Sequence, residues 1–305
     1  MLAILGSRYG TLIVLVAIIA VLPLVFPSSY YFRVASLVWI SAFAAIGLNI
    51  LMGKAGQVSL GHAGFFGIGA YAVAIGPAHL GLPSLAALVI GVVISALLAY
   101  LVGRPILRLK GHYLAIATLG FGVLAALVLT TESRWTGGPD GMSVARLSIL
   151  GWRASGSNTW YWITGGLLLA GTWIALNLDE TPTGRAFRAL HDSEIAARVT
   201  GVNVNRFKLQ AFVIAAVYAS LAGSALAMMN GFVNPDQAGF LHSVELVTMV
   251  VLGGLGSVVG SIVGAAVLIR DVTEVKRRDR ALLSKDATIR EIHHRVKNNL
   301  QTVAA

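Results

Sequence analysis

Three polar side chains, Gln57, Ser59 and His62, interrupt the stretch GKAGQVSLGHAGFFGIGAY, which runs from Gly53 into a long apolar segment. Polar groups at the start of a membrane span are costly unless they are paired or face water, and they often mark a solute pathway. The alternative is that they only hydrogen-bond to neighbouring helices, and the sequence leaves both interpretations open for His62. No second histidine or carboxylate lies at ligand spacing, so we expect no metal site.

Glycines recur at helical spacing in two places. Gly61, Gly64 and Gly67 follow one another every third residue, and Gly256, Gly260 and Gly264 every fourth. A helix face without side chains allows a close approach of another helix. Both sets therefore predict tight helix packing, within the chain or, for the second set, across a dimer. The pair Gly253-Gly254 is expected to break or kink the last span.

Composition places these residues in a membrane. Hydrophobic residues make up 56% of the 305 residues and charged residues 12%, whereas a soluble domain carries about 25% charged residues. Mean hydropathy is +0.78. A spanning helix needs about 20 mostly apolar residues. We predict an all-α polytopic membrane protein with about eight spans, near 10–27, 34–52, 62–80, 84–103, 113–131, 159–177, 208–228 and 243–268.

The distribution of basic residues predicts the orientation. With the N-terminus in the cytoplasm, ten Lys and Arg residues lie in internal segments and four in external loops, as the positive-inside rule requires. An even number of spans then returns the C-terminal tail to the cytoplasm. The net charge of +10 is explained by this rule, so we expect no nucleic-acid partner.

Two loops are long enough to have roles of their own. The external loop 132–158 is either a connection or a docking surface. The internal segment 178–207 predicts two short helices, one capped by Thr183 and a second capped by Ser193 that ends at Gly201. Amphipathic helices of this kind suit a partner's groove; the alternative is a solvated linker.

No energy source is visible within the chain. The only ionisable acid inside the apolar spans is Glu245, whereas ion-driven carriers usually bury acids in a relay. The sequence also lacks the phosphate-binding pattern G-x-x-x-x-G-K-[ST]. Such a protein either conducts passively or takes energy from a separate subunit, and the loop 184–201 is where that subunit would act.

Several blocks carry a family resemblance. In order they are LNILMGKAGQVSLGHAGFFGIGAYAVA, LKGHYLAIATLGFG, WTGGPDG, TPTGRAFRALHDSEIAARVTGVNVNRFKLQAFVIAA and ELVTMVVLGGLGSVVGSIVGAA. Together they resemble the permease of branched-chain amino acid ABC transporters over about residues 30–268. The resemblance implies import at the bacterial inner membrane. It implies four kinds of partner: a second homologous permease, two ATP-binding cassette subunits, an extracytoplasmic substrate-binding protein and the lipid bilayer. It implies no cofactor and no catalytic residue in this chain, because ATP is held by partner subunits.

The resemblance also implies which residues couple the permease to the ATPases. Permeases of this kind carry an E-A-A-x-x-x-G-like pattern in a cytoplasmic coupling helix. Here Ala196, Ala197 and Gly201 match it, and Glu194 lies one place before the pattern's acid.

The tail has a different character. From Arg270 onward 14 of 36 residues are charged, and hydrophobic residues recur at heptad spacing, which predicts a short dimerising helix. IREIHHRVKNNLQTVAA resembles the phosphoacceptor helix of sensor histidine kinases, after a segment like their linker. That resemblance implies His294 as phosphoacceptor. The simpler alternative is a solvated histidine pair.

We therefore predict two parts, a permease domain over 1–268 and an incomplete kinase linker and dimerisation helix over 269–305. The kinase ATP-binding domain does not follow within these residues, so we expect no autophosphorylation by this chain and no enzyme activity. A joined gene product, an assembly accident or a piece of a longer fusion would each explain the pairing. A membrane-bound sensor that presents His294 to a kinase domain elsewhere is the alternative function.

Overall fold

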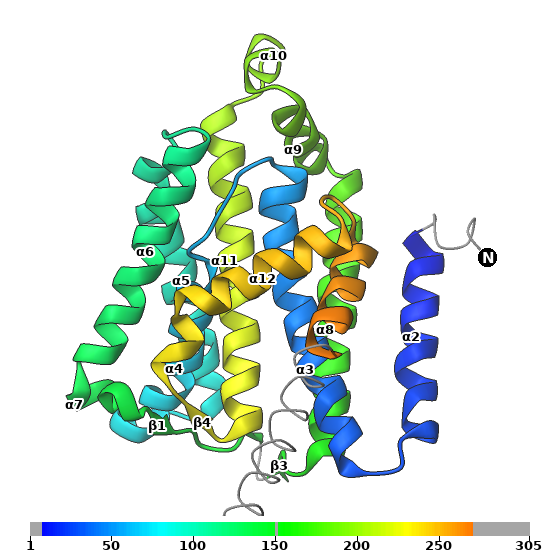
Figure 1. Cartoon of the computed structure of the whole chain (residues 1–305), viewed down its shortest axis with the longest axis vertical. Helices are drawn as coiled ribbons and strands as arrows, with labels where there is room; N and C mark the ends of the chain where they lie inside the picture. Colours follow the sequence, from blue (N-terminus) through cyan, green and yellow to red (C-terminus); the bar gives the residue numbers. More distant parts are fainter. Residues whose placement is uncertain (1–7, 150–151, 271–305) are drawn as a thin grey trace, which may run out of the picture. The chain divides into compact units, whose positions relative to one another are not determined.

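The chain is a helical membrane protein in the computed structural model, which describes residues 8–149 and 152–270. It divides into two compact units, Met1–Ala266 and Val267–Ala305. The first unit contains the elements α2 to α12 (Figure 1). The predicted tail helix and His294 lie outside the described residues.

Six helices in the described part of the chain are long and apolar enough to cross a membrane. They are α3 (Ser29–Asn49) with its extension η1 (Ile50–Lys54), α4 (His62–Leu80), α5 (Ser84–Ile106), α6 (His112–Thr131), α8 (Ser157–Glu180) and α11 (Val204–Asn230). The predicted all-α polytopic fold is confirmed. The first predicted span is α2 (Arg8–Val25), which is shorter and packs against α8.

The last predicted span is divided. In place of one helix over 243–268, the structure has α12 (Phe240–Gly253) and a second helix, Val258–Arg270. Gly254 and Gly256 between them have φ values of 103° and 82°, which only glycine adopts readily. The apolar composition predicted that this segment lies in the membrane. Gly254 and Gly256 end α12 before the helix is long enough to cross the membrane.

Short elements join the helices. At one end lie α7 (Ser133–Thr136), η2 (Gly138–Asp140), η3 (Pro235–Ala238) and four two-residue strands. Strand β1 (Met142–Ser143) pairs antiparallel with β4 (Phe232–Val233), and β2 (Ser148–Ile149) with β3 (Trp152–Arg153). The helices α9 (Pro182–Asp192) and α10 (Glu194–Val199) lie at the opposite end (Figure 1).

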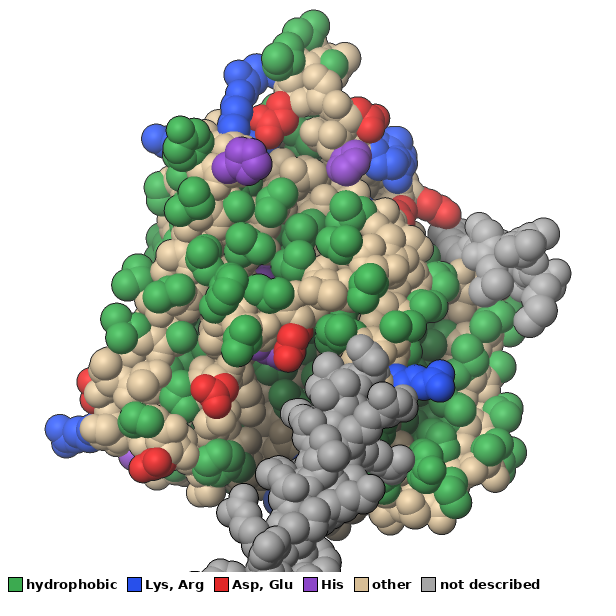
Figure 2. All heavy atoms as spheres, viewed as in Figure 1, with side chains coloured by type: hydrophobic (Ala, Val, Ile, Leu, Met, Phe, Trp, Pro, Cys, Tyr) green, Lys and Arg blue, Asp and Glu red, His purple; other side chains and the backbone are tan. Residues whose placement is uncertain are grey.

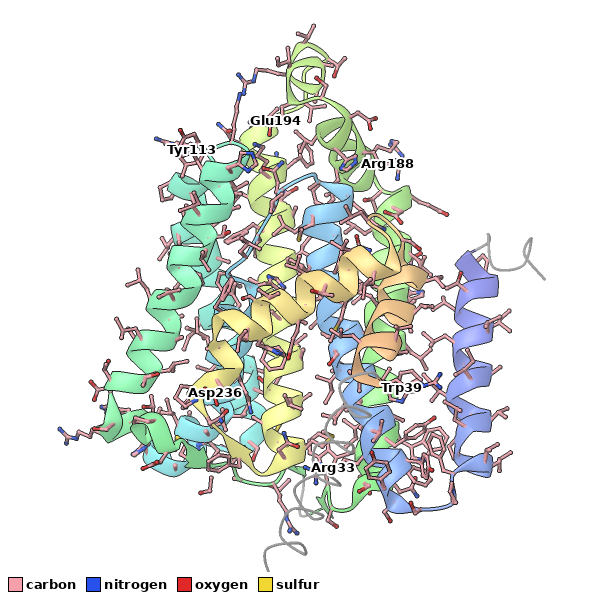
Figure 3. The ribbon with its side chains drawn as sticks, viewed as in Figure 1. Arg33, Trp39, Tyr113, Arg188, Glu194 and Asp236 are labelled. Carbon is pink, nitrogen blue, oxygen red and sulfur yellow. The ribbon has the colours of Figure 1, made fainter. Side chains whose placement is uncertain are left out.

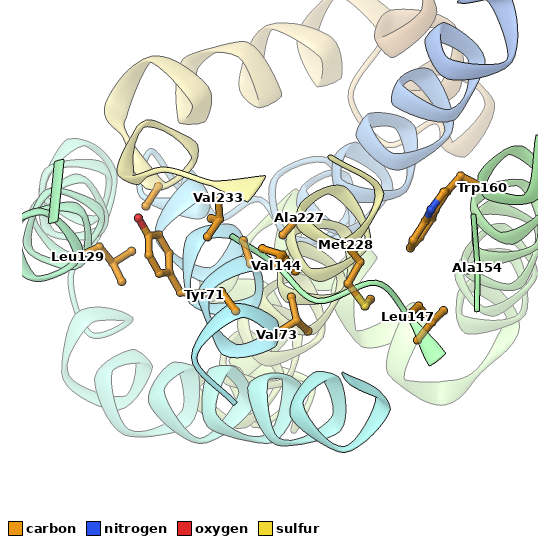
Figure 4. Packing of buried hydrophobic residues seen from close by; sticks show 13 residues of the cluster. Tyr71, Val73, Leu129, Val144, Leu147, Ala154, Trp160, Ala227, Met228 and Val233 are labelled. Atoms are coloured by element: carbon orange, nitrogen blue, oxygen red, sulfur yellow. The ribbon is translucent and has the colours of Figure 1, made fainter. Parts of the chain in front are cut away.

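The long loop before α8 belongs to a buried core. Val144, Leu147 and Ala154 from this loop pack with residues of α4, α8 and α11 such as Tyr71, Trp160 and Met228 (Figure 4). The loop therefore closes one end of the helix bundle. Its exposed side remains available as a surface.

Helices α4 and α11 form the centre of the bundle. Their backbones approach so closely that only glycine fits at the contact. A Cβ atom at Gly69 would lie 2.1 Å from the Ser220 carbonyl oxygen, and a Cβ atom at Gly223 would lie 1.9 Å from the Phe66 carbonyl oxygen. The Ser224 hydroxyl donates to the Gly69 carbonyl at 2.9 Å. This pairing of small and hydroxyl residues is typical of membrane helices.

The outer helices expose apolar side chains. On α5 the exposed set includes Leu85, Val89, Ile90, Val93, Ile94 and Leu97. Figure 2 shows hydrophobic side chains across the middle of one face, with several Lys, Arg and His side chains near its upper end and others lower down. Such a surface suits contact with lipid.

Candidate functional site

The polar residues predicted for a pathway lie in a buried turn between α3 and α4. The helix α3 passes directly into the π-helix η1, which ends at Lys54, and a short irregular segment then leads to Gly61. Lys54, Gln57, Ser59 and His62 are all buried. Single π-helical turns within α-helices are often found at functional sites. This turn thus combines irregular backbone with buried polar groups.

Ser59 is 1% exposed, and the other two predicted residues differ in their hydrogen bonds. The Gln57 amide donates to the Ala55 carbonyl at 2.9 Å, so it stabilises the turn itself. His62 begins α4 with an exposure of only 1%. Its Nε2 atom has no hydrogen-bond partner among the described residues. A buried polar nitrogen without a partner is costly, which makes His62 the member of the set best suited to receive a ligand.

Helix α12 lies against the start of α4. The Ser243 hydroxyl accepts a hydrogen bond from the Ala63 backbone N–H at 3.0 Å. The His242 ring packs edge-on to Phe66 with centroids 4.6 Å apart, and its Nδ1 lies 3.1 Å from a Glu245 carboxylate oxygen. Sequence reasoning did not select His242. Its spacing from Glu245 on one helix was the available signal.

The glycines of α4 bring its backbone against α6 and η3. A Cβ atom at Gly61 would lie 1.8 Å from the Thr118 carbonyl oxygen. At Gly64 it would lie 3.2 Å from the Phe121 ring, and at Gly67 2.3 Å from the Ala238 Cβ. The Thr118 hydroxyl also accepts from the Leu60 N–H at 3.1 Å.

Asn49 holds the turn that divides the last span. Its Nδ2 donates to the Ser257 carbonyl at 2.8 Å and to the Ser261 hydroxyl at 2.7 Å, and its Oδ1 accepts from the Gly256 N–H at 2.7 Å. The side chain is 1% exposed. Asn49 immediately precedes η1, so the turn and the π-helix are joined through one amide. Sequence reasoning missed it, although an amide within an apolar run was a signal.

The second set of predicted glycines packs within the chain, with one exception. A Cβ atom added at Gly260 would lie 2.0 Å from the Gly253 carbonyl oxygen. A Cβ atom added at Gly264 would lie 2.0 Å from the Met249 carbonyl oxygen. Gly256 is not on this face, because it lies in the turn before the helix begins. The prediction of one continuous face through Gly256 is therefore wrong. The four-residue spacing carried no information on where the helix starts.

The segment after α8 forms the two predicted short helices. Thr181 caps α9 by accepting from the Gly184 N–H at 3.2 Å, so the prediction of Thr183 as the cap is wrong. Pro182 follows at the first helical position, which suits proline. Ser193 caps α10 by accepting from the Ala196 N–H at 3.3 Å. The chain leaves α10 through Gly201, at a φ of 86°.

The residues predicted for coupling lie on both faces of α10. Ala197 is buried at 2% exposure and packs with Leu190 and Val204, whereas Ala196 is exposed. Ile195 and Val199, four residues apart, are 75% and 83% exposed. Residues at this spacing share one helix face. The helix thus presents two apolar side chains outward.

Charged pairs connect this segment to the bundle. Glu194 forms an ion pair with Lys208 near the start of α11, and Lys208 is only 2% exposed. Lys54 at the end of η1 pairs with Asp179 at the end of α8. Arg188 of α9 donates to the Asp179 carbonyl at 2.8 Å. Figure 3 shows Glu194 and Arg188 at the end opposite to Arg33 and Asp236.

Helix α9 also touches the turn that contains the polar residues. A Cβ atom at Gly56 would lie 3.2 Å from the His191 Cα. The segment 182–201 and the turn 55–61 are therefore in contact at one end of the bundle. Among residues 8–149 and 152–270 no cluster of three His, Cys, Asp or Glu residues could hold a metal ion.

The family of this chain follows from comparison with known proteins. The model of the branched-chain amino acid transport system permease component matches residues 30–270. The chain belongs to this permease family. The high-affinity branched-chain amino acid transport system permease protein LivM of Salmonella typhimurium is 34% identical over 260 residues, 77% of this chain and 61% of that protein. The chain thus spans about three fifths of the length of this relative.

Other relatives differ in their named cargo. The autoinducer 2 import system permease protein LsrC of Klebsiella pneumoniae is 34% identical over 167 residues, 52% of this chain and 46% of that protein. These relatives are permease components of transporters. No solved structure matches the chain.

A further, shorter match is to a signalling protein and not to a permease. The sensor histidine kinase PdtaS of Mycolicibacterium smegmatis is 94% identical over 46 residues, 15% of this chain and 9% of that protein. The resemblance of the tail to a sensor histidine kinase is confirmed. The role of His294 stays a prediction.

Proposed function

We propose that the chain is the membrane-spanning permease subunit of an ABC importer for branched-chain or related amino acids. Its helices form one half of a substrate path, and a separate ATPase subunit drives the change of conformation through α9 and α10. The observation that carries the proposal is the outward apolar pair Ile195 and Val199 on α10, a helix joined to the bundle by the Glu194–Lys208 pair.

Movement of α10 has two physical routes into the bundle. Lys208 is buried in α11, so a displacement of Glu194 acts on the central helix directly. The second route begins at α9, whose Arg188 donates to the Asp179 carbonyl. Asp179 forms an ion pair with Lys54, so a movement of α9 is passed on to η1. Both routes use charged pairs, whose energy depends strongly on geometry when they are shielded from water.

The substrate path passes the turn 55–61 and the start of α4. His62 is the candidate for substrate contact because its Nε2 is buried without a partner among the described residues. Gln57 and Ser59 shape the turn that presents it. An amino acid offers both a carboxylate acceptor and an ammonium donor, and either could be read by an imidazole.

The remaining parts of the proposal concern partners and placement. A second homologous permease completes the path, two ATP-binding cassette subunits hold ATP, and an extracytoplasmic binding protein delivers the substrate. The chain itself carries no cofactor. The N-terminus and the end with α9 and α10 face the cytoplasm of a bacterium, which the distribution of Lys and Arg supports.

Reconstitution tests the proposal. The full chain is placed in vesicles with a partner permease, ATPase subunits and binding protein, and uptake of labelled leucine, isoleucine and valine is measured. We expect uptake that requires both ATP and the ATPase subunits. Uptake without the ATPase subunits at the same rate as with them would contradict the proposal.

A second function is favoured by the 46-residue match to a sensor histidine kinase. In this alternative the membrane part senses a solute and His294 accepts a phosphoryl group from a kinase domain in trans. Incubation with labelled ATP and such a domain should label the tail. Label that persists in His294→Gln would contradict that residue as the acceptor.

A further inference from the structure

A cavity of about 890 Å³ opens at the end of the bundle that carries α9 and α10. It lies between the last turns of α5, the first half of α11 and the junction of α8 with α9. Its lining residues include Tyr100, Arg104, Arg108, Arg206, Leu209 and Val213. None of these was assigned to the substrate path or to coupling.

The mouth of the cavity is positively charged. Three arginines line it, and no carboxylate is among the lining residues. The Arg104 guanidinium lies 4.3 Å from the centre of the Tyr100 ring and donates to the Tyr100 hydroxyl. In the part of the chain that the structure describes, Arg108 and Arg206 make no ion pair with Asp or Glu.

The inner wall of the cavity is apolar. Leu107 and Leu178 lie near the arginines, and Leu209, Val213 and Ile214 continue along α11 toward the middle of the membrane span. The arginines are close to helix ends, where lipid headgroups lie, and the apolar residues lie at the depth of acyl chains. The cavity therefore offers two environments in the order found in a phospholipid.

We infer that this cavity binds an anionic phospholipid, with its phosphate between Arg104, Arg108 and Arg206 and an acyl chain along Leu209 and Val213. Guanidinium groups bind phosphate through two parallel hydrogen bonds, and basic pockets between membrane helices bind anionic headgroups. A small free anion would leave the apolar wall without a partner. The wall therefore favours the lipid over inorganic phosphate.

Phosphatidylglycerol is the probe of choice, because its anionic phosphate suits the three arginines and its acyl chains suit the apolar wall. Gln210, which follows Leu209 on α11, lies at the depth of the acyl chain and does not distinguish among anionic headgroups.

Native mass spectrometry of the full chain in detergent tests the inference. Delipidated protein is titrated with phosphatidylglycerol, with phosphatidylcholine of the same acyl chains and with inorganic phosphate. We expect selective retention of phosphatidylglycerol. Arg104→Gln with Arg206→Gln should weaken that retention about thirtyfold, since each surface arginine contributes about fivefold to binding an anionic lipid.

A matched variant removes two charges outside the cavity. Arg185→Gln with Arg198→Gln should keep the preference for phosphatidylglycerol, as should Arg206→Lys, which retains the charge and controls for folding. Equal retention of phosphatidylglycerol and phosphatidylcholine by the wild type would overturn the inference. Inorganic phosphate that displaces the lipid at equal concentration, or equal losses in both arginine pairs, would overturn it as well.

Discussion

Asn49 is the residue on which the irregular parts of this bundle depend. Its amide joins the π-helix η1 to the turn after α12 through hydrogen bonds to Ser257, Ser261 and Gly256. These bonds satisfy backbone groups of the turn after α12, whereas η1 keeps its own π-helical bond from the Ala55 N–H to the Ile50 carbonyl at 3.1 Å. This role could not be derived from sequence, because it requires the pairing of residues more than 200 positions apart.

Replacement of Asn49 by alanine should destabilise the bundle. Asn49→Ala leaves the Gly256 N–H and the Ser257 carbonyl without this partner, and we expect a loss of about 1–3 kcal/mol in the free energy of unfolding. Thermal unfolding in detergent measures it. Asn158→Ala, at an exposed position of α8, is the matched control and should change stability by less than about 0.5 kcal/mol. Equal melting temperatures for the two variants would contradict this role.

The close approach of α4 to α6 depends on Gly61. Gly61→Ala places a methyl group 1.8 Å from the Thr118 carbonyl oxygen, so the helices must separate, and we expect a loss of about 1–3 kcal/mol. In Gly120→Ala on α6 the added Cβ meets no atom within 4 Å. That variant should be neutral or stabilised by up to about 1 kcal/mol. Denaturation curves in which both variants match the wild type would contradict the packing.

At the scale of elements, hydrophobic runs predicted the six long helices to within a few residues. The bounds of α4 were predicted as found because polar residues and Gly81 flank its apolar run. The break predicted at Gly253-Gly254 is confirmed, because α12 ends at Gly253 and Gly254 has a φ of 103°. The bounds of the last span were not predicted, since mean hydropathy cannot distinguish one long helix from two short ones. The cap of α9 was misplaced because Thr181 and Thr183 are both suitable residues, and tertiary contacts decide between them.

The connection of α10 to α11 is testable by a double-mutant cycle. Glu194→Gln leaves the Lys208 ammonium buried without its counter-charge, and we expect a loss of about 1–3 kcal/mol, reduced because Glu194 is 23% exposed. Lys208→Met in the same chain should recover part of that loss, because it removes the unpaired charge. Glu132→Gln is the control at an exposed position. Additive effects of the two substitutions would show that the pair contributes nothing.

At the scale of the whole molecule, the two ends of the bundle differ in construction. One end is closed by the loop 132–158, which adds Val144, Leu147 and Ala154 to a core. The other end carries α9 and α10 with their charged pairs. Composition predicted a membrane protein, which is confirmed, and the distribution of Lys and Arg predicted which end faces the cytoplasm, which stays a prediction. The contact of α9 with the turn 55–61 could not be predicted, since it arises from long-range packing.

The proposed orientation predicts labelling from one side only. The natural sequence has no cysteine, so single cysteines report without background. Arg134→Cys on α7 should react with a membrane-impermeant maleimide in intact cells, whereas Arg198→Cys on α10 should react only after permeabilisation. Both arginines are exposed in the protein. The reverse pattern would contradict the orientation.

The central claim is that a separate ATPase drives transport through α10, and uptake by Ile195→Ser/Val199→Ser tests it most directly. The variant is reconstituted with its partner subunits, and ATP-dependent leucine uptake is compared with that of wild type and of Val89→Ser/Val93→Ser, a pair exposed on α5. We expect the α10 variant to lose at least about 90% of uptake, since the two exposed side chains would be buried on docking, and the loss of about 1.5 kcal/mol from each weakens docking more than tenfold. The α5 pair should retain most of its uptake. Undiminished ATP-dependent uptake by the α10 variant would contradict the claim.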